Sequence, residues 1–259
     1  MSGLLADRVV LVVGGTSGVG AATARVARRE GATVAVAGRR REHGEKVAAD
    51  LGALFVSCDV ADVEACRTAV STVLAEFGRV DGLVNAAGLT DRGSLLDTSP
   101  ELFDAHVAVN LRGPFFLMQA VVADLVRRGE PGSIVNIGSE AARGGAPELS
   151  PYAATRGGLA TLTRNAAHAH RFDRIRINQL DIGWTATEGE DATQRRFHGA
   201  DDDWRARAGA DLPAGRLADP EDAAEMVVLL LSDRSGVVTG SVIDWDQQVP
   251  GAHDGKALQ

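Results

Sequence analysis

The sequence is poor in cysteine and in aromatic residues, and it holds no long apolar run. Two cysteines in 259 residues suggest neither a disulfide framework nor a zinc site, so no metal site is expected. The amino-terminal segment lacks the basic start and apolar middle of a signal peptide, and no apolar run reaches the length of a membrane span. A formal charge of -8 argues against nucleic acid as a partner. These absences predict a cytoplasmic protein without membrane or nucleic-acid partners.

Linkers and internal repeats are also absent. A chain of 259 residues exceeds the usual domain size, yet doubly wound sheets commonly reach this length around one core. No proline-rich or low-complexity segment divides the sequence. We therefore expect a single domain over residues 1–259.

A glycine-rich turn follows the first apolar run of the chain. Residues 8–13 are expected to form a buried strand, 21–30 a helix, and 32–37 a second strand. A strand, glycine turn, helix and strand within about thirty residues is typical of a dinucleotide site, where helix amides face a pyrophosphate. The alternative is a turn whose glycines serve only tight packing. The predicted phosphate-binding residues are Gly14, Thr16, Ser17, Gly18, Val19 and Gly20.

Strands and helices alternate along the rest of the chain. Further strands are expected at 80–85, 132–138, 174–178 and 241–245, and helices at about 62–77, 101–128, 151–170 and 220–232. Such alternation predicts an α/β fold, a Rossmann-type doubly wound parallel sheet of about seven strands flanked by helices. Ligands of such sheets bind beyond the carboxyl ends of the strands.

A serine, a tyrosine and an arginine stand where the chemistry of this chain is expected. Ser139 ends one predicted strand, and Tyr152 and Arg156 lie four residues apart on one face of the next helix. Ser150 is a suitable N-cap for that helix, and Pro151 suits its first position. A phenol, a hydroxyl and a fixed cation beside a dinucleotide are what carbonyl reduction needs. The alternative is that Tyr152, at a helix start, and Ser139, at a strand end, have structural roles only.

Several motifs in this order resemble the short-chain dehydrogenase/reductase family in its compact branch, over about residues 7–246. They are Gly14, Gly18 and Gly20, Asp59-Val60, Asn85-Ala86-Ala87-Gly88, Asn110, Ser139 and Tyr152. The resemblance implies that Tyr152 is the general acid and base, that Ser139 holds the substrate oxygen, and that the cation binds the nicotinamide ribose. It also implies cofactor contacts at Asp59, Val60, Asn85, Ala86 and Gly88, and at Ile182, Gly183, Thr185 and Thr187.

The end of the second strand indicates which dinucleotide is preferred. Gly38 stands where an NAD site holds an acidic residue against the ribose hydroxyl, and Arg39 and Arg40 follow it. Guanidinium groups bind a 2′-phosphate through charge-assisted hydrogen bonds. We expect NADP(H), with NAD(H) as the alternative. A solvated basic helix start is the other interpretation of these arginines.

Two of the positions that depart from the family pattern lie in the predicted site. Arg156 stands where a lysine is expected, and Ile182 where a proline is expected. Guanidinium keeps the charge but does not release a proton, so a proton relay through lysine and Asn110 would be altered. The chain has only Lys46 and Lys256 as lysines, so a general bias toward arginine also explains the exchange. The two hypotheses are a ketone reductase or alcohol dehydrogenase, and a cofactor-binding scaffold or sensor with weakened redox activity.

A polar segment over about 184–212 is expected to form a lid over the substrate. The aromatic residues Trp184, Phe197 and Trp204 would either stack on a flat or cyclic substrate or fasten the lid to the body. The resemblance implies a small-molecule carbonyl or alcohol substrate and a homotetramer or homodimer.

Overall fold

The computed structural model describes residues 3–249, so the predicted domain limits at residues 1 and 259 lie outside the described residues. Its strands form one seven-stranded sheet in the order β3-β2-β1-β4-β5-β6-β7, and every pairing is parallel. The strands are β1 Val9–Val13, β2 Thr33–Gly38, β3 Leu54–Ser57, β4 Gly82–Asn85, β5 Gly132–Ser139, β6 Ile175–Ile182 and β7 Val242–Trp245. The predicted doubly wound α/β fold is confirmed.

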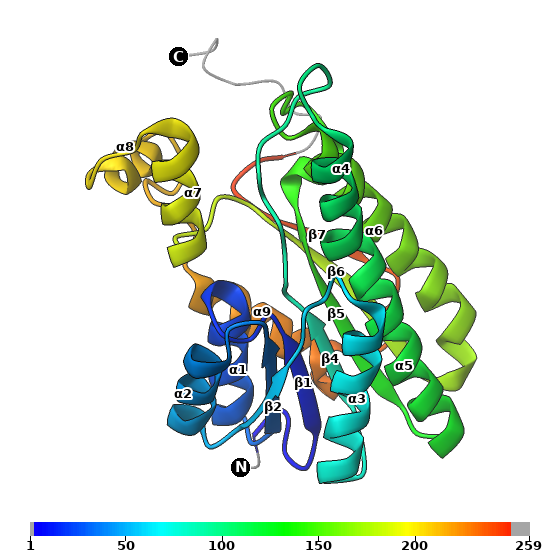
Figure 1. Ribbon diagram of the computed structural model, residues 1–259. Helices are drawn as coiled ribbons and strands as arrows, with labels where there is room; N and C mark the ends of the chain where they lie inside the picture. The colour runs from blue at the N-terminus through cyan, green and yellow to red at the C-terminus, as the bar shows by residue number, and fades with distance from the viewer. Residues whose placement is uncertain (1–2, 250–259) are drawn as a thin grey trace.

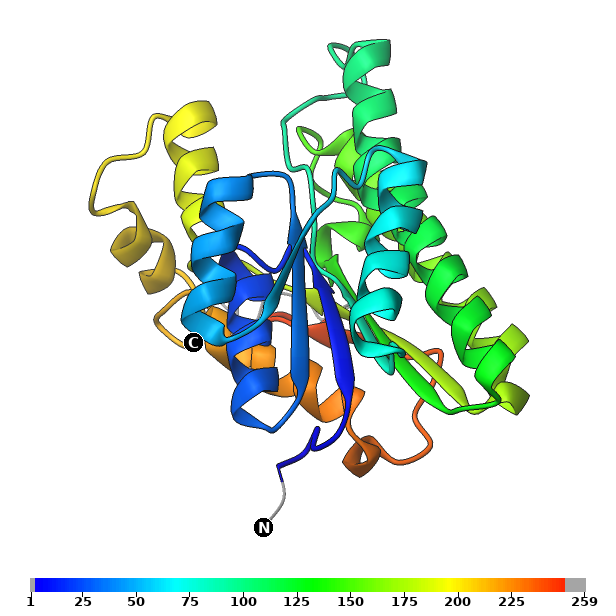
Figure 2. The same cartoon turned by 60° about the horizontal axis from the view of Figure 1, so that its bottom comes forward.

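Helices cover both faces of the sheet (Figure 1; Figure 2). One face carries α1 Gly18–Arg29, α2 Arg41–Leu51 and α9 Pro220–Leu231, and the other carries α3 Val63–Phe77, α4 Pro100–Val107, α5 Gly113–Arg128 and α6 Ser150–His170. Strand β1 shows why both faces need a helical cover, because Leu11 packs into the core on one face and Val12 into the core on the other. A strand buried on both faces must be apolar throughout, as the sequence of β1 is.

The helix predicted over 101–128 is two helices joined by a π-helical turn, Ala108–Arg112. The Gly113 amide donates to the Ala108 carbonyl, five residues back. Pro114 has no N–H for the carbonyl of Asn110, so the regular α-helical bond is missing at this point. The predicted helix is present over 100–128, and a π turn at a predicted catalytic residue interrupts its regular hydrogen bonding.

Two predictions fail at element boundaries. Strand β6 runs on to Ile182, well beyond the predicted end, because its last four residues pair with β7 on one side and β5 on the other. Ser150 does not cap α6, since its hydroxyl donates to the Pro147 carbonyl at 2.9 Å and the helix already includes it. The elongated β6 brings Ile182 to the same edge as Ser139.

One helical stretch passes a test for membrane spans that the sequence was not expected to pass. Residues Pro100–Arg128 include an 18-residue window of mean hydropathy 1.2, half of which is buried inside the protein. Leu117, Val121 and Leu125 of this stretch lie in the core beneath the sheet. The core helix of a soluble protein passes the same test, so the finding is weak support for a membrane span.

Candidate active site

A cavity of about 1180 Å³ opens at the carboxyl ends of the strands. The lid segment forms one wall through α7 Glu188–His198, and α8 Trp204–Ala210 follows it (Figure 1). Of the predicted site residues, the following line the cavity: Gly14, Thr16, Ser17, Gly18, Val19, Gly20, Arg39, Arg40, Val60, Ala86, Gly88, Ser139, Tyr152, Arg156, Ile182, Gly183, Thr185 and Thr187. Asp59, Asn85 and Asn110 are not among its lining residues.

The glycine turn between β1 and α1 has no room for side chains. A Cβ on Gly14 would lie 2.5 Å from the Ala87 amide nitrogen, and one on Gly20 would lie 2.2 Å from the Gly14 carbonyl oxygen. Gly14 also has a φ of 80°, which favours glycine. Ser17 precedes the helix without a capping bond from its side chain, so the first helix amides face the cavity. This cradle fits a pyrophosphate at a helix N-terminus.

The end of β2 presents basic groups to the cavity. Arg39 and Arg40 are exposed and line it, and Gly38 lies against Thr16. His43 Nε2 lies 2.7 Å from the Thr16 carbonyl oxygen and ties the first turn of α2 to the glycine turn. The Asp59 carboxylate instead accepts from the Ala61 amide at 3.0 Å. Asp59 therefore forms a local turn, and α3 is capped by Asp62.

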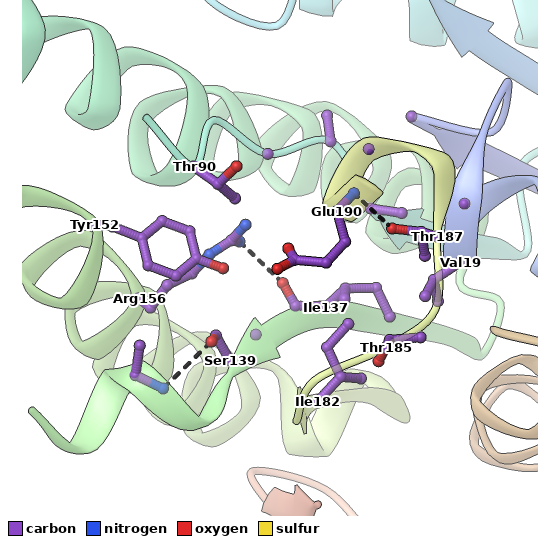
Figure 3. A pocket seen from close by; sticks show the side chains of 18 of the residues that line it. Val19, Thr90, Ile137, Ser139, Tyr152, Arg156, Ile182, Thr185, Thr187 and Glu190 are labelled. Carbon is purple, nitrogen blue, oxygen red and sulfur yellow. Dashed lines mark hydrogen bonds between the residues drawn. The ribbon is translucent and has the colours of Figure 1, made fainter. Parts of the chain in front are cut away.

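Ser139, Tyr152 and Arg156 meet on one wall of the cavity (Figure 3). Tyr152, the only tyrosine of the chain, is 8% exposed, and the guanidinium carbon of Arg156 lies 5.0 Å from its ring centre. Arg156 Nη1 donates to the Ile137 carbonyl at 3.0 Å. Its Nε is buried and has no hydrogen-bond partner within residues 3–249. A buried donor of this kind is free for a ligand hydroxyl, as the ribose of a dinucleotide offers.

Asn110 lies behind that wall in a dense hydrogen-bond network. It exchanges bonds with Leu89, accepting from the amide at 2.8 Å and donating to the carbonyl at 3.0 Å. Its Nδ2 also lies 3.1 Å from His106 Nδ1 and 3.2 Å from Thr155 Oγ1. Asn110 is thus placed to hold the β4–α4 loop against the start of α6.

His106 is fully buried and supports Asn110. Its Nε2 lies 3.0 Å from the Asp91 carbonyl oxygen, which can only accept, so Nε2 carries the proton and Nδ1 accepts from Asn110. Burial lowers the pKa of His106 below its ordinary value. Its ring meets Tyr152 edge to face, with ring centres 6.2 Å apart. Sequence analysis missed this residue, because a histidine inside an amphipathic helix carries no distinguishing pattern.

The loop after β4 contributes backbone and small side chains. Asn85 is buried and donates to Asn136 Oδ1 at 2.8 Å, so it ties β4 to β5 and does not line the cavity. A Cβ on Gly88 would lie 2.4 Å from Arg156 Nη2. Gly88 therefore leaves the space that the large guanidinium occupies.

The segment predicted to form a lid begins beside the residues predicted to contact the nicotinamide. Thr187 accepts from the Glu190 amide at 3.0 Å and caps α7, while its methyl group lies 3.3 Å from the position of a Cβ on Gly18. Thr187, at the start of α7, therefore lies against the glycine turn. Trp204 is buried and donates to Asp191 at 2.7 Å, so it fastens the lid helices, whereas Trp184 lines the cavity.

Further polar residues outside the predicted site line the cavity. They are Thr90, Arg92, Glu140, Arg143, Glu148, Glu190, Gln194, His198 and Gln248. Burial, together with the nearby Asp246 carboxylate, raises the pKa of Glu140. Arg143 donates to Asp246 at 2.6 Å. Of these residues only Glu190 belongs to a recognisable local sequence pattern. The spacing Thr187-x-x-Glu190 is that of a helix-capping box, which indicates a structural role.

Comparison with known proteins decides the family. A solved structure described as a short chain dehydrogenase/reductase family protein superimposes with a TM-score of 0.82 at 37% identity, covering 95% of this chain and 98% of the other. The family model described as enoyl-(acyl carrier protein) reductase matches residues 13–247. The chain belongs to the short-chain dehydrogenase/reductase family.

Curated members of this family are similar over nearly their whole length. The 2-(S)-hydroxypropyl-CoM dehydrogenase 3 of Xanthobacter autotrophicus is 34% identical over 95% of this chain and 98% of its own. The inactive 2-(S)-hydroxypropyl-CoM dehydrogenase 2 of the same organism is 36% identical over 86% and 97%. Membership of the short-chain dehydrogenases/reductases makes this protein an oxidoreductase of alcohols and carbonyl compounds that uses NAD(P)(H).

Proposed function

We propose that the protein is an NADP(H)-preferring ketone reductase or secondary alcohol dehydrogenase acting on a small or medium-sized metabolite. The observation that carries this proposal is the meeting of Ser139, Tyr152 and Arg156 in the same cavity as the glycine cradle. A bound NADP(H) would supply or accept the hydride.

In carbonyl reduction the carbonyl carbon gains a hydride and its oxygen gains a proton. Tyr152 Oη donates that proton, and Ser139 Oγ donates a hydrogen bond that holds and polarises the same oxygen. The Arg156 guanidinium carbon lies 5.0 Å from the phenol ring centre, so a positive charge stands beside the group that gives up its proton. Ala141 donates its amide to Ser139 Oγ at 3.2 Å, so the serine keeps its own proton for the substrate.

The nucleotide preference is supported by the end of β2. No acidic residue directly follows this strand, and Arg39 and Arg40 are exposed at the cavity without an ion-pair partner among residues 3–249. An exposed guanidinium pair can close on a 2′-phosphate, which NADP(H) has and NAD(H) lacks.

Other features support the remaining parts of the proposal. All described strands belong to one sheet, as expected for one domain. Cys58 and Cys66 are both free thiols, which is consistent with the cytoplasm. Leu95 and Leu96 are 91% and 97% exposed, and such apolar side chains are suited to a subunit contact in a homotetramer or homodimer.

A second candidate function rests on Arg156. Because this guanidinium is bound to the Ile137 carbonyl and is never deprotonated, it cannot pass a proton onward as a lysine can. A cofactor-binding scaffold or sensor with weak redox activity is the alternative, and one similar curated protein is described as inactive.

The two candidates are separated by turnover and cofactor binding measured on the same samples. A panel of ketones and alcohols with NADPH, NADH and their oxidised forms, followed at the nicotinamide absorbance band, should reveal turnover for the unaltered protein. Tyr152→Phe should abolish it with nearly unchanged cofactor affinity, because the phenol supplies the proton. Cofactor binding without turnover by the unaltered protein would favour the scaffold. Full reduction by Tyr152→Phe would refute the assigned mechanism.

A further inference from the structure

Glu190 is an acidic side chain of the lid that points into the cavity. Figure 3 shows it extending from the first turn of α7 toward the side where Tyr152 and Arg156 lie. One of its carboxylate oxygens, Oε1, accepts from Trp184 Nε1 at 2.7 Å and from Gln194 Nε2 at 2.8 Å. These two donors fix the direction of the carboxylate, and the other oxygen, Oε2, has no hydrogen-bond partner in the part of the chain that the structure describes.

A capping role does not account for this orientation. In a capping box the glutamate three residues after the cap reaches back to the cap residue's own amide. Thr187 does accept from the Glu190 amide, but its own amide donates to the Thr185 carbonyl at 2.9 Å. The Glu190 carboxylate therefore does not cap the helix and points into the cavity.

Two further arginines line the cavity, and of these only Arg143 is ion-paired within the described residues. Arg92 donates to the Thr90 carbonyl at 3.0 Å and lies 3.4 Å from His198 Nε2. Arg143 is bound to Asp244 and Asp246. Glu190 therefore offers a fixed acceptor, while Arg156 keeps a buried Nε without a hydrogen-bond partner in residues 3–249. A substrate hydroxyl group can donate to such a carboxylate, whereas a substrate carboxylate or phosphate group beside it would meet a like charge.

We propose that Glu190 is a specificity-determining residue that accepts a hydrogen bond from a second hydroxyl group of the substrate, so that the substrate is a hydroxyketone or the corresponding diol. This inference rests on the proposed alcohol and ketone chemistry at Tyr152. It narrows the substrate class from alcohols in general to compounds with a hydroxyl group besides the reacting one.

Matched substrates test the assignment. Cyclohexane-1,2-diol and cyclohexane-1,4-diol are compared with cyclohexanol, using NADP⁺ and the variants Glu190→Gln and Glu190→Leu. Glu188→Gln is the control, because Glu188 lies in the same helical turn but is exposed and does not line the cavity. A hydrogen bond to a charged group corresponds to roughly a tenfold to hundredfold effect on kcat/KM. At least one diol should lose that much in Glu190→Leu and less in Glu190→Gln, while cyclohexanol changes little in either.

The outcomes separate this inference from the proposed function. Equal losses for diols and cyclohexanol would overturn it, since Glu190 would then only shape the lid. A weakened Kd for NADP⁺ in Glu190→Leu would also overturn it, by assigning the carboxylate to the cofactor. If no alcohol turns over, the proposed function fails. The inference about Glu190 is then tested by diol binding to the NADP⁺ complex, followed by tryptophan fluorescence because Trp184 donates to Glu190. Diol binding that Glu190→Leu removes would still support the inference, and equal binding by both proteins would overturn it.

Discussion

Gly88→Ala tests how the site accommodates an arginine where its relatives are expected to hold lysine. The backbone of Gly88 is not among those with positive φ, so alanine is conformationally acceptable there. The added methyl group would lie 2.4 Å from Arg156 Nη2, and its next neighbours, the Arg156 guanidinium carbon and Asn110 Oδ1, are at 3.7 and 3.8 Å. The clash is therefore with one nitrogen, which lysine lacks.

The size of the effect follows from what the guanidinium must give up. Arg156 is 5% exposed and is held by its 3.0 Å bond to the Ile137 carbonyl, so moving away from the methyl group breaks or bends that bond. A hydrogen bond to a charged group contributes about 1.5–3 kcal/mol. Gly88→Ala should lower the free energy of unfolding by about that amount, and by less than about 0.5 kcal/mol when Arg156→Lys is present.

The assay is a double-mutant cycle over Gly88→Ala and Arg156→Lys. Urea unfolding gives the free energies, and turnover with the best substrate of the panel gives a second readout. Arg156→Lys should rescue both stability and kcat in Gly88→Ala. Free energies that add within about 0.5 kcal/mol would show that the two positions do not interact, and would refute the steric argument.

Three further predictions concern the cofactor, pH and assembly. Arg39→Ala should weaken NADPH binding roughly tenfold to hundredfold and leave NADH binding unchanged. Arg41→Ala is the control, because Arg41 does not line the cavity. Equal affinities of the unaltered protein for both cofactors would contradict this prediction. Because burial lowers the pKa of His106, the unfolded chain takes up that proton more readily than the folded protein. The free energy of unfolding should therefore rise with pH up to about 6.5, and this contribution should be lost as the pH falls. Urea unfolding from pH 5 to 7 measures the trend. If His106→Asn showed the same dependence of unfolding free energy on pH as the unaltered protein, His106 would not be its cause. Light scattering should return four subunits or two, and monomers alone at micromolar concentration would count against either assembly.

The sequence predicted the parts of the site that local patterns determine. The glycine turn, Ser139 and Tyr152 all follow or precede strongly patterned strands and helices, and the parallel sheet brings them to one edge. The fold class followed from the same alternation. Such features need only the period of apolar residues and the chemistry of a few turns.

Features that depend on packing between distant segments were not predictable in the same way. The π turn at Ala108–Arg112 had a local signal in Gly113-Pro114, but the apolar period on both sides favoured one helix. Ser150 looked like a cap and instead bonds to Pro147, because the chain before α6 folds back on itself. His106 and Glu190 gain their positions from contacts with Asp91 and Trp184, whose placement no single-sequence pattern gives.

The single tyrosine has a practical consequence for spectroscopy. Because Tyr152 is the only tyrosine in the chain, biosynthetic incorporation of a fluorinated tyrosine would place one ¹⁹F nucleus in the whole protein, on an aromatic ring that lines the cavity. One resonance would then report cofactor arrival, lid movement and substrate contact without assignment or background. The label would thus be confined to the predicted proton donor.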